Sequence, residues 1–237
     1  MTATEQTASG VVLRDYQLEA LDAIDREHAT HRSTLLVLAT GLGKTTAFAE
    51  HIARRHVLGE QALVLAHREE LVTQAGDRIR EQTGLRVGIE MAQQRDGTSA
   101  QMMLDGRGRP DVIVASVQTL SRATRLKRLD VARVRTVVID EAHHATAASY
   151  SRVLDAMPKA TVLGVTATPD RADEIGLREV FATCAFRMEL RAGIDRGYLS
   201  PVHGLTVVCA DLDVSRVKVR GGVVSHAPPP PAHHALS

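Results

Sequence analysis

The chain has 237 residues, of which 44% are hydrophobic and 24% charged, proportions typical of a globular protein rather than a disordered or fibrous one. A chain of this length buries roughly 70 to 75% of its unfolded surface, which predicts one sizeable domain and a short further segment. The formal net charge of +1 excludes a strongly basic protein, so any affinity for nucleic acid must come from locally placed basic groups.

The sequence also bears on where the protein works. Its first ten residues lack the basic and then apolar pattern of a secretory signal, and no apolar run approaches the roughly 20 residues that cross a bilayer. The two cysteines are too few for a disulfide framework in a domain of this size. These features predict a cytoplasmic protein with no membrane partner.

Short apolar runs of strand length recur along the chain and are rich in β-branched residues. In chain order they are Leu35–Ala39, Ala62–Ala66, Leu85–Ile89, Val112–Val117, Thr136–Ile139 and Thr161–Val165. Helical patterns are found at Asp15–His28, Lys44–Leu58, Glu69–Gln82 and Ser149–Met157. Because nearly continuous apolar strands suit a sheet buried on both faces, the pattern predicts an α/β fold with a doubly wound, mainly parallel sheet and helices on both faces.

Changes in composition predict the domain boundaries. Residues 1–10 are polar and predicted to be disordered, residues 11–205 form the α/β domain, and residues 206–222 begin a connector that could contain a further strand. The last segment, residues 223–237, is rich in proline and histidine and is predicted to be a disordered tail.

A glycine-containing loop follows the first predicted strand. Gly41 and Gly43 precede Lys44 and Thr45, which open a helix, and such a loop can turn its backbone N–H groups toward phosphate oxygens. Lys44 is then predicted to hold the β- and γ-phosphates of a nucleotide, and Thr45 to place its hydroxyl on Mg²⁺. The general pattern has a glycine where this chain has Leu38, so the loop alone leaves a chance match open.

Two acids end the fifth predicted strand. Asp140 is predicted to hold Mg²⁺ through its water shell, and Glu141 to orient and deprotonate the attacking water. The alternative is a solvated acidic pair that opens a helix, where acids are favoured in any case. Adjacent histidines, His143 and His144, follow without a cysteine or histidine cluster, so no zinc site is predicted.

Hydroxyl side chains end the sixth predicted strand. Thr166 and Thr168 could bond to the acidic strand end and couple it to the γ-phosphate, or form a turn before Pro169. The three features occur in the order of a nucleotide-hydrolysing site, and each lies at a strand end.

These residues resemble the motifs of superfamily 2 helicases in the DEAD/DEAH-box branch that contains the type III restriction enzyme (ResIII) subunits. Motif I resembles Ala39–Thr45, motif II resembles Asp140–His143, and motif III resembles Thr166–Pro169. In that branch the position of Leu38 is often apolar. The resemblance spans about residues 13–205 and implies an N-terminal RecA-like ATP-binding domain.

The resemblance implies a nucleotide site larger than the loop. Leu13–Gln17 resembles the adenine-reading Q motif, in which Gln17 would bond to the adenine edge. The implied cofactors are ATP and Mg²⁺. The implied ATP-binding residues are Gln17, Thr40, Gly41, Leu42, Gly43, Lys44, Thr45, Thr46 and His143.

The resemblance also implies a nucleic-acid track made mainly of phosphate contacts. Motif Ia resembles Ala66–Leu71 and motif Ib resembles Ala115–Leu120, which assigns the track to His67, Arg68, Ser116, Gln118 and Thr119. The alternative for Arg68 is a solvated helix start. A basic stretch over residues 122–135 could also touch phosphates, although its interleaved leucines and valines favour an amphipathic surface element.

The resemblance predicts an ATP-dependent helicase or translocase acting on DNA more than on RNA. No residue after Thr206 resembles the motifs of a second RecA-like domain, so we expect a truncated or frameshifted chain that is nearly inactive alone, with a separate chain as a possible source of that domain. The other functions left open are a non-catalytic ATP-dependent binding module and the motor subunit of a restriction complex.

Overall fold

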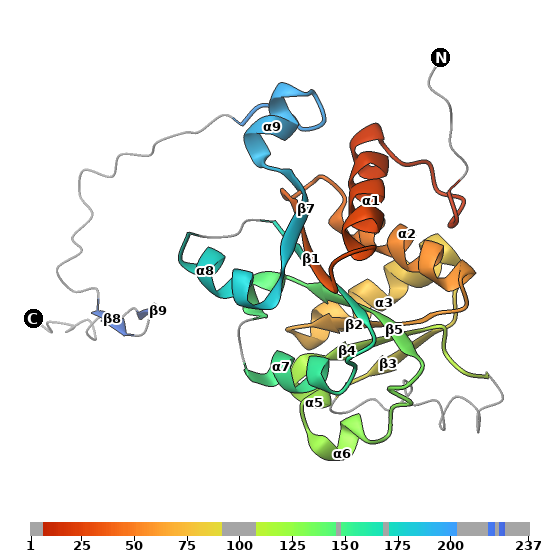
Figure 1. Ribbon diagram of the computed structural model, residues 1–237. Coiled ribbons are helices and arrows are strands. Elements are labelled where there is room, and N and C mark those ends of the chain that lie inside the picture. The colour runs from red at the N-terminus through yellow and green to blue at the C-terminus, as the bar shows by residue number, and fades with distance from the viewer. Residues whose placement is uncertain are drawn as a thin grey trace, which may run out of the picture. The chain divides into compact units, whose positions relative to one another are not determined.

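The computed structural model describes residues 7–91, 108–145, 148–167, 171–202, 218–220 and 223–225, with the backbone alone at 171–175 and in the last two ranges. The chain divides into two compact units, Met1–Ser200 and Pro201–Ser237. The first unit contains the sheet shown in Figure 1. It ends a few residues before the predicted boundary at residue 205.

Seven strands form one sheet in the order β3-β4-β2-β5-β6-β1-β7. Each neighbouring pair runs parallel. The strands are β1 Ser33–Leu38, β2 Gln61–Ala66, β3 Val87–Glu90, β4 Val112–Ser116, β5 Val134–Asp140, β6 Thr161–Thr166 and β7 Thr183–Met188. Because all carboxyl ends of parallel strands lie on one edge, the loops after β1, β5 and β6 meet there.

Helices cover both faces of this sheet (Figure 1). The helices of the first face are α1 Asp15–His28, α2 Lys44–Val57 and α3 Glu69–Thr83. Those of the second face are α5 Val117–Leu120, α7 Ala148–Asp155 and α8 Arg171–Val180. Shorter helices are α6 Ala123–Leu126, η1 Ala142–His144 and α9 Leu190–Asp195.

The alternation of side chains along each strand explains this two-sided cover. Leu36 and Leu38 of β1 pack in the core under α1 and α2, while Leu35 and Val37 pack in the core on the opposite face. All six residues of β2 are buried. The predicted doubly wound α/β fold is therefore confirmed.

Strand β7 and helices α8 and α9 were not among the predicted elements. The residues of β7 are mostly half-buried or exposed, as expected for the edge of the sheet, so its apolar signal is weak. Strand β3 begins at Val87 rather than at Leu85.

The structure describes part of each of the two segments predicted to be disordered, residues 7–10 and 223–225. Near the N-terminus, the backbone amides of Ala8 and Ser9 donate to the Glu50 carboxylate at 2.7 and 3.1 Å. Glu50 is fully buried in α2 and so requires donors. In the second unit, strand β8 Lys218–Arg220 pairs antiparallel with β9 Val223–Ser225, where β-branched valines favour a hairpin.

None of the helices in the described parts of the chain combines the length and apolar character that a membrane span requires.

Candidate functional site: the phosphate loop and the acidic strand end

The loop between β1 and α2 has the backbone that its glycines permit. Gly41 and Gly43 have φ angles of +89° and +74°, in the region that favours glycine. Gly43 is the N-cap of α2, and no side chain caps this helix. The N–H groups of the first turn, starting at Lys44, therefore remain available for an anion.

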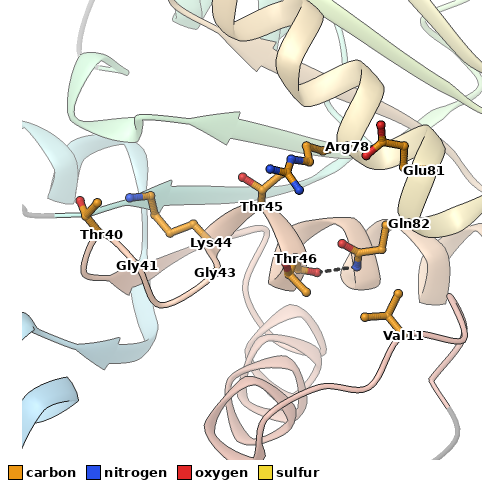
Figure 2. Close-up of a pocket in the computed structure, with 10 residues that line it drawn as sticks. All are labelled: Val11, Thr40, Gly41, Gly43, Lys44, Thr45, Thr46, Arg78, Glu81 and Gln82. Atoms are coloured by element: carbon orange, nitrogen blue, oxygen red, sulfur yellow. Dashed lines mark hydrogen bonds between the residues drawn. The ribbon is translucent and has the colours of Figure 1, made fainter. Parts of the chain in front are cut away.

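A pocket of about 580 Å³ opens beside this loop (Figure 2). From the loop and the start of α2 it is lined by Thr40, Gly41, Gly43, Lys44, Thr45 and Thr46. In Figure 2 the Lys44 side chain extends along the loop toward Thr40. The predicted loop residues are thus brought together around one cavity, except Leu42, which is fully buried.

Residues of the predicted adenine-reading segment form hydrogen bonds to the backbone of this loop. Tyr16 Oη and Gln17 Nε2 donate to the Leu42 carbonyl at 2.8 and 3.2 Å, and Gln17 Oε1 accepts from the Arg14 amide at 3.0 Å. Gln17 is 5% exposed. Its side chain is therefore engaged with protein groups, and its contact with adenine stays a prediction.

The acidic strand end lies on the same sheet edge as the loop. Strand β6 separates β1 from β5, so Asp140 at the end of β5 is two strands from the loop that follows β1. Burial, and after it the charge of Glu141, raise the pKa of Asp140 above its ordinary value, while Lys44 and His143 act in the opposite direction. A cation at this point would stabilise the ionised carboxylate.

Glu141 and His143 join this strand end to β6. The His143 Nδ1 atom lies 3.4 Å from Glu141 Oε2 and 3.4 Å from Thr166 Oγ1. Glu141 lines a second pocket, of about 370 Å³, together with His67, Arg68 and His143. The structure therefore brings Thr166 to the acidic end, whereas Thr168 lies outside the described residues.

The five predicted nucleic-acid residues separate into an exposed and a buried group. Ser116 caps α5: its Oγ accepts from the Thr119 amide at 3.3 Å and donates to Thr119 Oγ1 at 2.8 Å. Ser116 and Thr119 are 1% and 3% exposed and are engaged in this cap, so their contact with nucleic acid stays a prediction. Arg68 and Gln118 are exposed and His67 is half-buried.

Several residues at the loop pocket were missed by the sequence analysis. Val11 and three residues of α3, Arg78, Glu81 and Gln82, also line it. Gln82 Nε2 donates to the Thr46 carbonyl at 3.0 Å, as Figure 2 shows. The spacing of the three α3 residues places them on one helix face, but nothing local indicates that this face turns toward the loop.

Comparison with known proteins gives a consistent family. Residues 10–171 match the family described as "Type III restriction enzyme, res subunit". The chain is 36% identical over 225 residues to the "Putative ATP-dependent helicase IRC3" of Saccharomyces cerevisiae, and 28% identical over 219 residues to the "Type I restriction enzyme EcoAI endonuclease subunit" of Escherichia coli. These alignments cover 89% and 87% of this chain, but 31% and 25% of those proteins. The chain thus spans a third or less of their length.

Solved structures share the fold. The type ISP restriction-modification enzyme LlaGI, solved with a DNA substrate mimic, matches 78% of this chain and 20% of its own with a TM-score of 0.61 and 19% identity. The Hef helicase domain of Pyrococcus furiosus matches 81% and 43%, with a TM-score of 0.59 and 22% identity. At identities of 19% and 22%, this similarity shows that the chain shares the RecA-like fold.

Proposed function

The chain belongs to the type III restriction enzyme res subunit family of superfamily 2 helicases, and on that premise we propose that it binds Mg-ATP at the loop after β1 and serves as the ATP-binding domain of a DNA helicase or translocase. The observation that carries this proposal is the meeting of three strand ends on one sheet edge. The loop with Lys44 follows β1, Thr166 ends β6, and Asp140 ends β5.

The loop has the chemistry that a triphosphate requires. Its two left-handed glycines and the uncapped start of α2 supply N–H donors, and Lys44 adds a positive charge. A Cβ on Gly43 would lie 2.7 Å from Gln17 Nε2, so a larger residue would have to displace the Gln17 side chain, which bonds to the loop. These features fit phosphate oxygens better than they fit an apolar ligand.

The residues also fit Mg²⁺. This ion prefers oxygen ligands and keeps several waters, so few protein groups are needed. The Thr45 hydroxyl and the Asp140 carboxylate would hold it, and the bound ion would neutralise charge on the phosphates. Glu141, beside the 370 Å³ pocket, would orient and deprotonate the attacking water, while Lys44 would hold the β- and γ-phosphates.

DNA is the favoured nucleic acid. The EcoAI relative is a restriction endonuclease subunit, and the LlaGI structure contains a DNA substrate mimic. Arg68, His67 and Gln118 would contact phosphates at the surface beside Glu141. Such contacts position a strand without reading its sequence.

The 237-residue chain by itself is expected to bind Mg-ATP weakly and to hydrolyse it slowly. In the helicases that it resembles, an arginine from a second RecA-like domain stabilises the γ-phosphate, and such an arginine changes the rate by about 10³- to 10⁵-fold. ATP hydrolysis is measured with and without single-stranded DNA. A large stimulation of the purified chain by DNA would contradict this part of the proposal.

Nucleotide binding is tested with a fluorescent ATP analogue and Mg²⁺. We expect Lys44→Ala to weaken binding at least about tenfold, since it removes the charge that faces the phosphates. Glu141→Gln should retain binding and lose the residual hydrolysis. Lys159→Ala removes an exposed lysine that precedes β6 and serves as the charge-matched control. An equal loss of binding in that variant would refute the assignment of Lys44.

A further inference from the structure

Two histidines from neighbouring strand ends stack on each other beside Glu141. The rings of His67, after β2, and His144, at the end of η1, have centroids 4.3 Å apart and planes 27° apart. Strands β2 and β5 are neighbours in the sheet, so the stack joins the loops that follow them. His144 also lines the 370 Å³ pocket with Glu141, but the proposed function gives it no role.

On one side of the stack, His144 contacts His143, which in turn lies beside Glu141 at the acidic strand end. The His143 and His144 rings lie 4.1 Å apart, and His143 Nδ1 is 3.4 Å from Glu141 Oε2. Glu141 has a φ of +50° and is the one non-glycine residue with positive φ among those that the structure describes. Such a conformation persists where the surrounding contacts hold it, and η1 carries these contacts.

On its outer side, the stack reaches the surface assigned to nucleic acid. Gln118 Nε2 lies 3.3 Å from His67 Nδ1, and Gln118 is exposed at the start of α5. Arg68, next to His67, is also exposed. A phosphate bound by these side chains would therefore act directly on one ring of the stack.

The surroundings of the stack favour the neutral form of the His144 ring. Partial burial, followed by the charges of His143 and His67, lowers the pKa of His144 below its ordinary value. Arg68 acts in the same direction, and Glu141 in the opposite one. A neutral His144 ring can stack on His67 without repulsion between two positive charges.

We propose that His144 is a positioning residue which, through its stack on His67, links nucleic-acid binding at His67 and Gln118 to the conformation of Glu141. This inference rests on the proposed function. Linkage is reciprocal, so nucleic acid and Mg-ATP should each raise the affinity for the other. The linkage factor is the ratio of the dissociation constants for Mg-ATP without and with bound nucleic acid. A single ring contact predicts a factor of roughly 2 to 10.

The linkage factor is measured on the 237-residue chain. A fluorescent ATP analogue with Mg²⁺ is titrated without and with a saturating single-stranded DNA oligonucleotide, and the reverse titration checks reciprocity. His144→Ala should bring the factor to about 1, with each ligand's own affinity unchanged within about twofold. His144→Phe keeps a stacking ring and should retain the factor. Because His144 is exposed, neither replacement disturbs the core.

Three results would overturn the inference: a factor near 1 in the unmodified chain, a factor unaffected by His144→Ala, or the loss of the factor in both His144 variants. His31→Ala, an exposed histidine after α1, is the matched control and should retain the factor. Failure of the proposed function gives a different result, since Lys44→Ala would then leave nucleotide binding intact whatever the His144 variants do.

Discussion

At the scale of single residues, the phosphate loop depends on two glycines with positive φ that both lie close to a side chain. A Cβ added to Gly41 would lie 3.0 Å from Leu199 Cδ2, and one added to Gly43 would lie 2.7 Å from Gln17 Nε2. Gln17 Nε2, which donates to the Leu42 carbonyl, occupies the space that a Cβ on Gly43 would need. Backbone conformation and side-chain contact therefore select glycine at the same position.

Gly43→Ala is expected to lower the free energy of unfolding by about 1 to 2 kcal/mol and to weaken nucleotide binding, because it combines backbone strain with a clash. Urea denaturation and the ATP-analogue titration measure the two effects. Gly59→Ala is the control: Gly59 has a φ of +82° but no atom within 4 Å of an added Cβ. It should lose about 1 kcal/mol of stability through strain and bind nucleotide normally. Equal losses of binding in both variants would rule out the clash with Gln17.

At the scale of elements, the basic stretch at α6 is mainly a surface element with one residue turned inward. Arg125 Nη1 lies 2.6 Å from Glu90 Oε1, and the two side chains are 11% and 2% exposed. This ion pair ties α6 to the end of β3. Arg122, Lys127 and Arg128 are exposed. The interpretation of the stretch as an amphipathic surface element fits this arrangement.

Arg125→Ala is expected to lower the free energy of unfolding by about 3 kcal/mol, because it leaves the Glu90 carboxylate buried without this partner. Chemical denaturation measures the change. Arg128→Ala removes an exposed arginine and should change stability by less than about 0.5 kcal/mol. Replacing both members of the pair, as Arg125→Met with Glu90→Leu, should recover much of the loss. A small effect of Arg125→Ala would show that solvent already screens the pair.

At the scale of the whole first unit, its N-terminal segment is tied to the centre of α2. Glu50 accepts from the Ala8 and Ser9 amides, and Arg54 Nε lies 3.8 Å away. The segment continues to Val11, which lines the loop pocket. The start of the domain thus contributes to both the core and the nucleotide site.

Deletion of residues 1–10 is expected to lower the free energy of unfolding by about 1 to 3 kcal/mol, since the buried Glu50 carboxylate loses two donors. Deletion of residues 1–6 retains both donors and is the control. In a Glu50→Leu background, the longer deletion should cost less, because the charge that required the donors is gone. Thermal or urea denaturation of the unmodified chain, the two deletions, Glu50→Leu and the combined variant measures these differences. Additive effects of the deletion and the substitution would contradict the contact between the N-terminal segment and Glu50.

The sequence by itself determined the local framework of this protein. Strands covered on both faces are apolar at nearly every position, so the sequence predicts the buried strands β1, β2, β4, β5 and β6. The loop with Lys44 and the acids at the end of β5 could be predicted because their chemistry depends on residues adjacent in the chain. Strand β7 could not, because an edge strand with exposed Cys184 and Arg187 lacks a continuous apolar run.

Only the tertiary structure decided which of these pieces meet. The strand order places β6 between the loop and the acidic end, turns one face of α3 toward the loop, and stacks His67 on His144. It also buries Ser116 and Thr119, which the motif alone assigned to the nucleic-acid track. Periodicity and motif spacing report the chain's local geometry, whereas contacts between distant residues follow from how strands order themselves in the sheet.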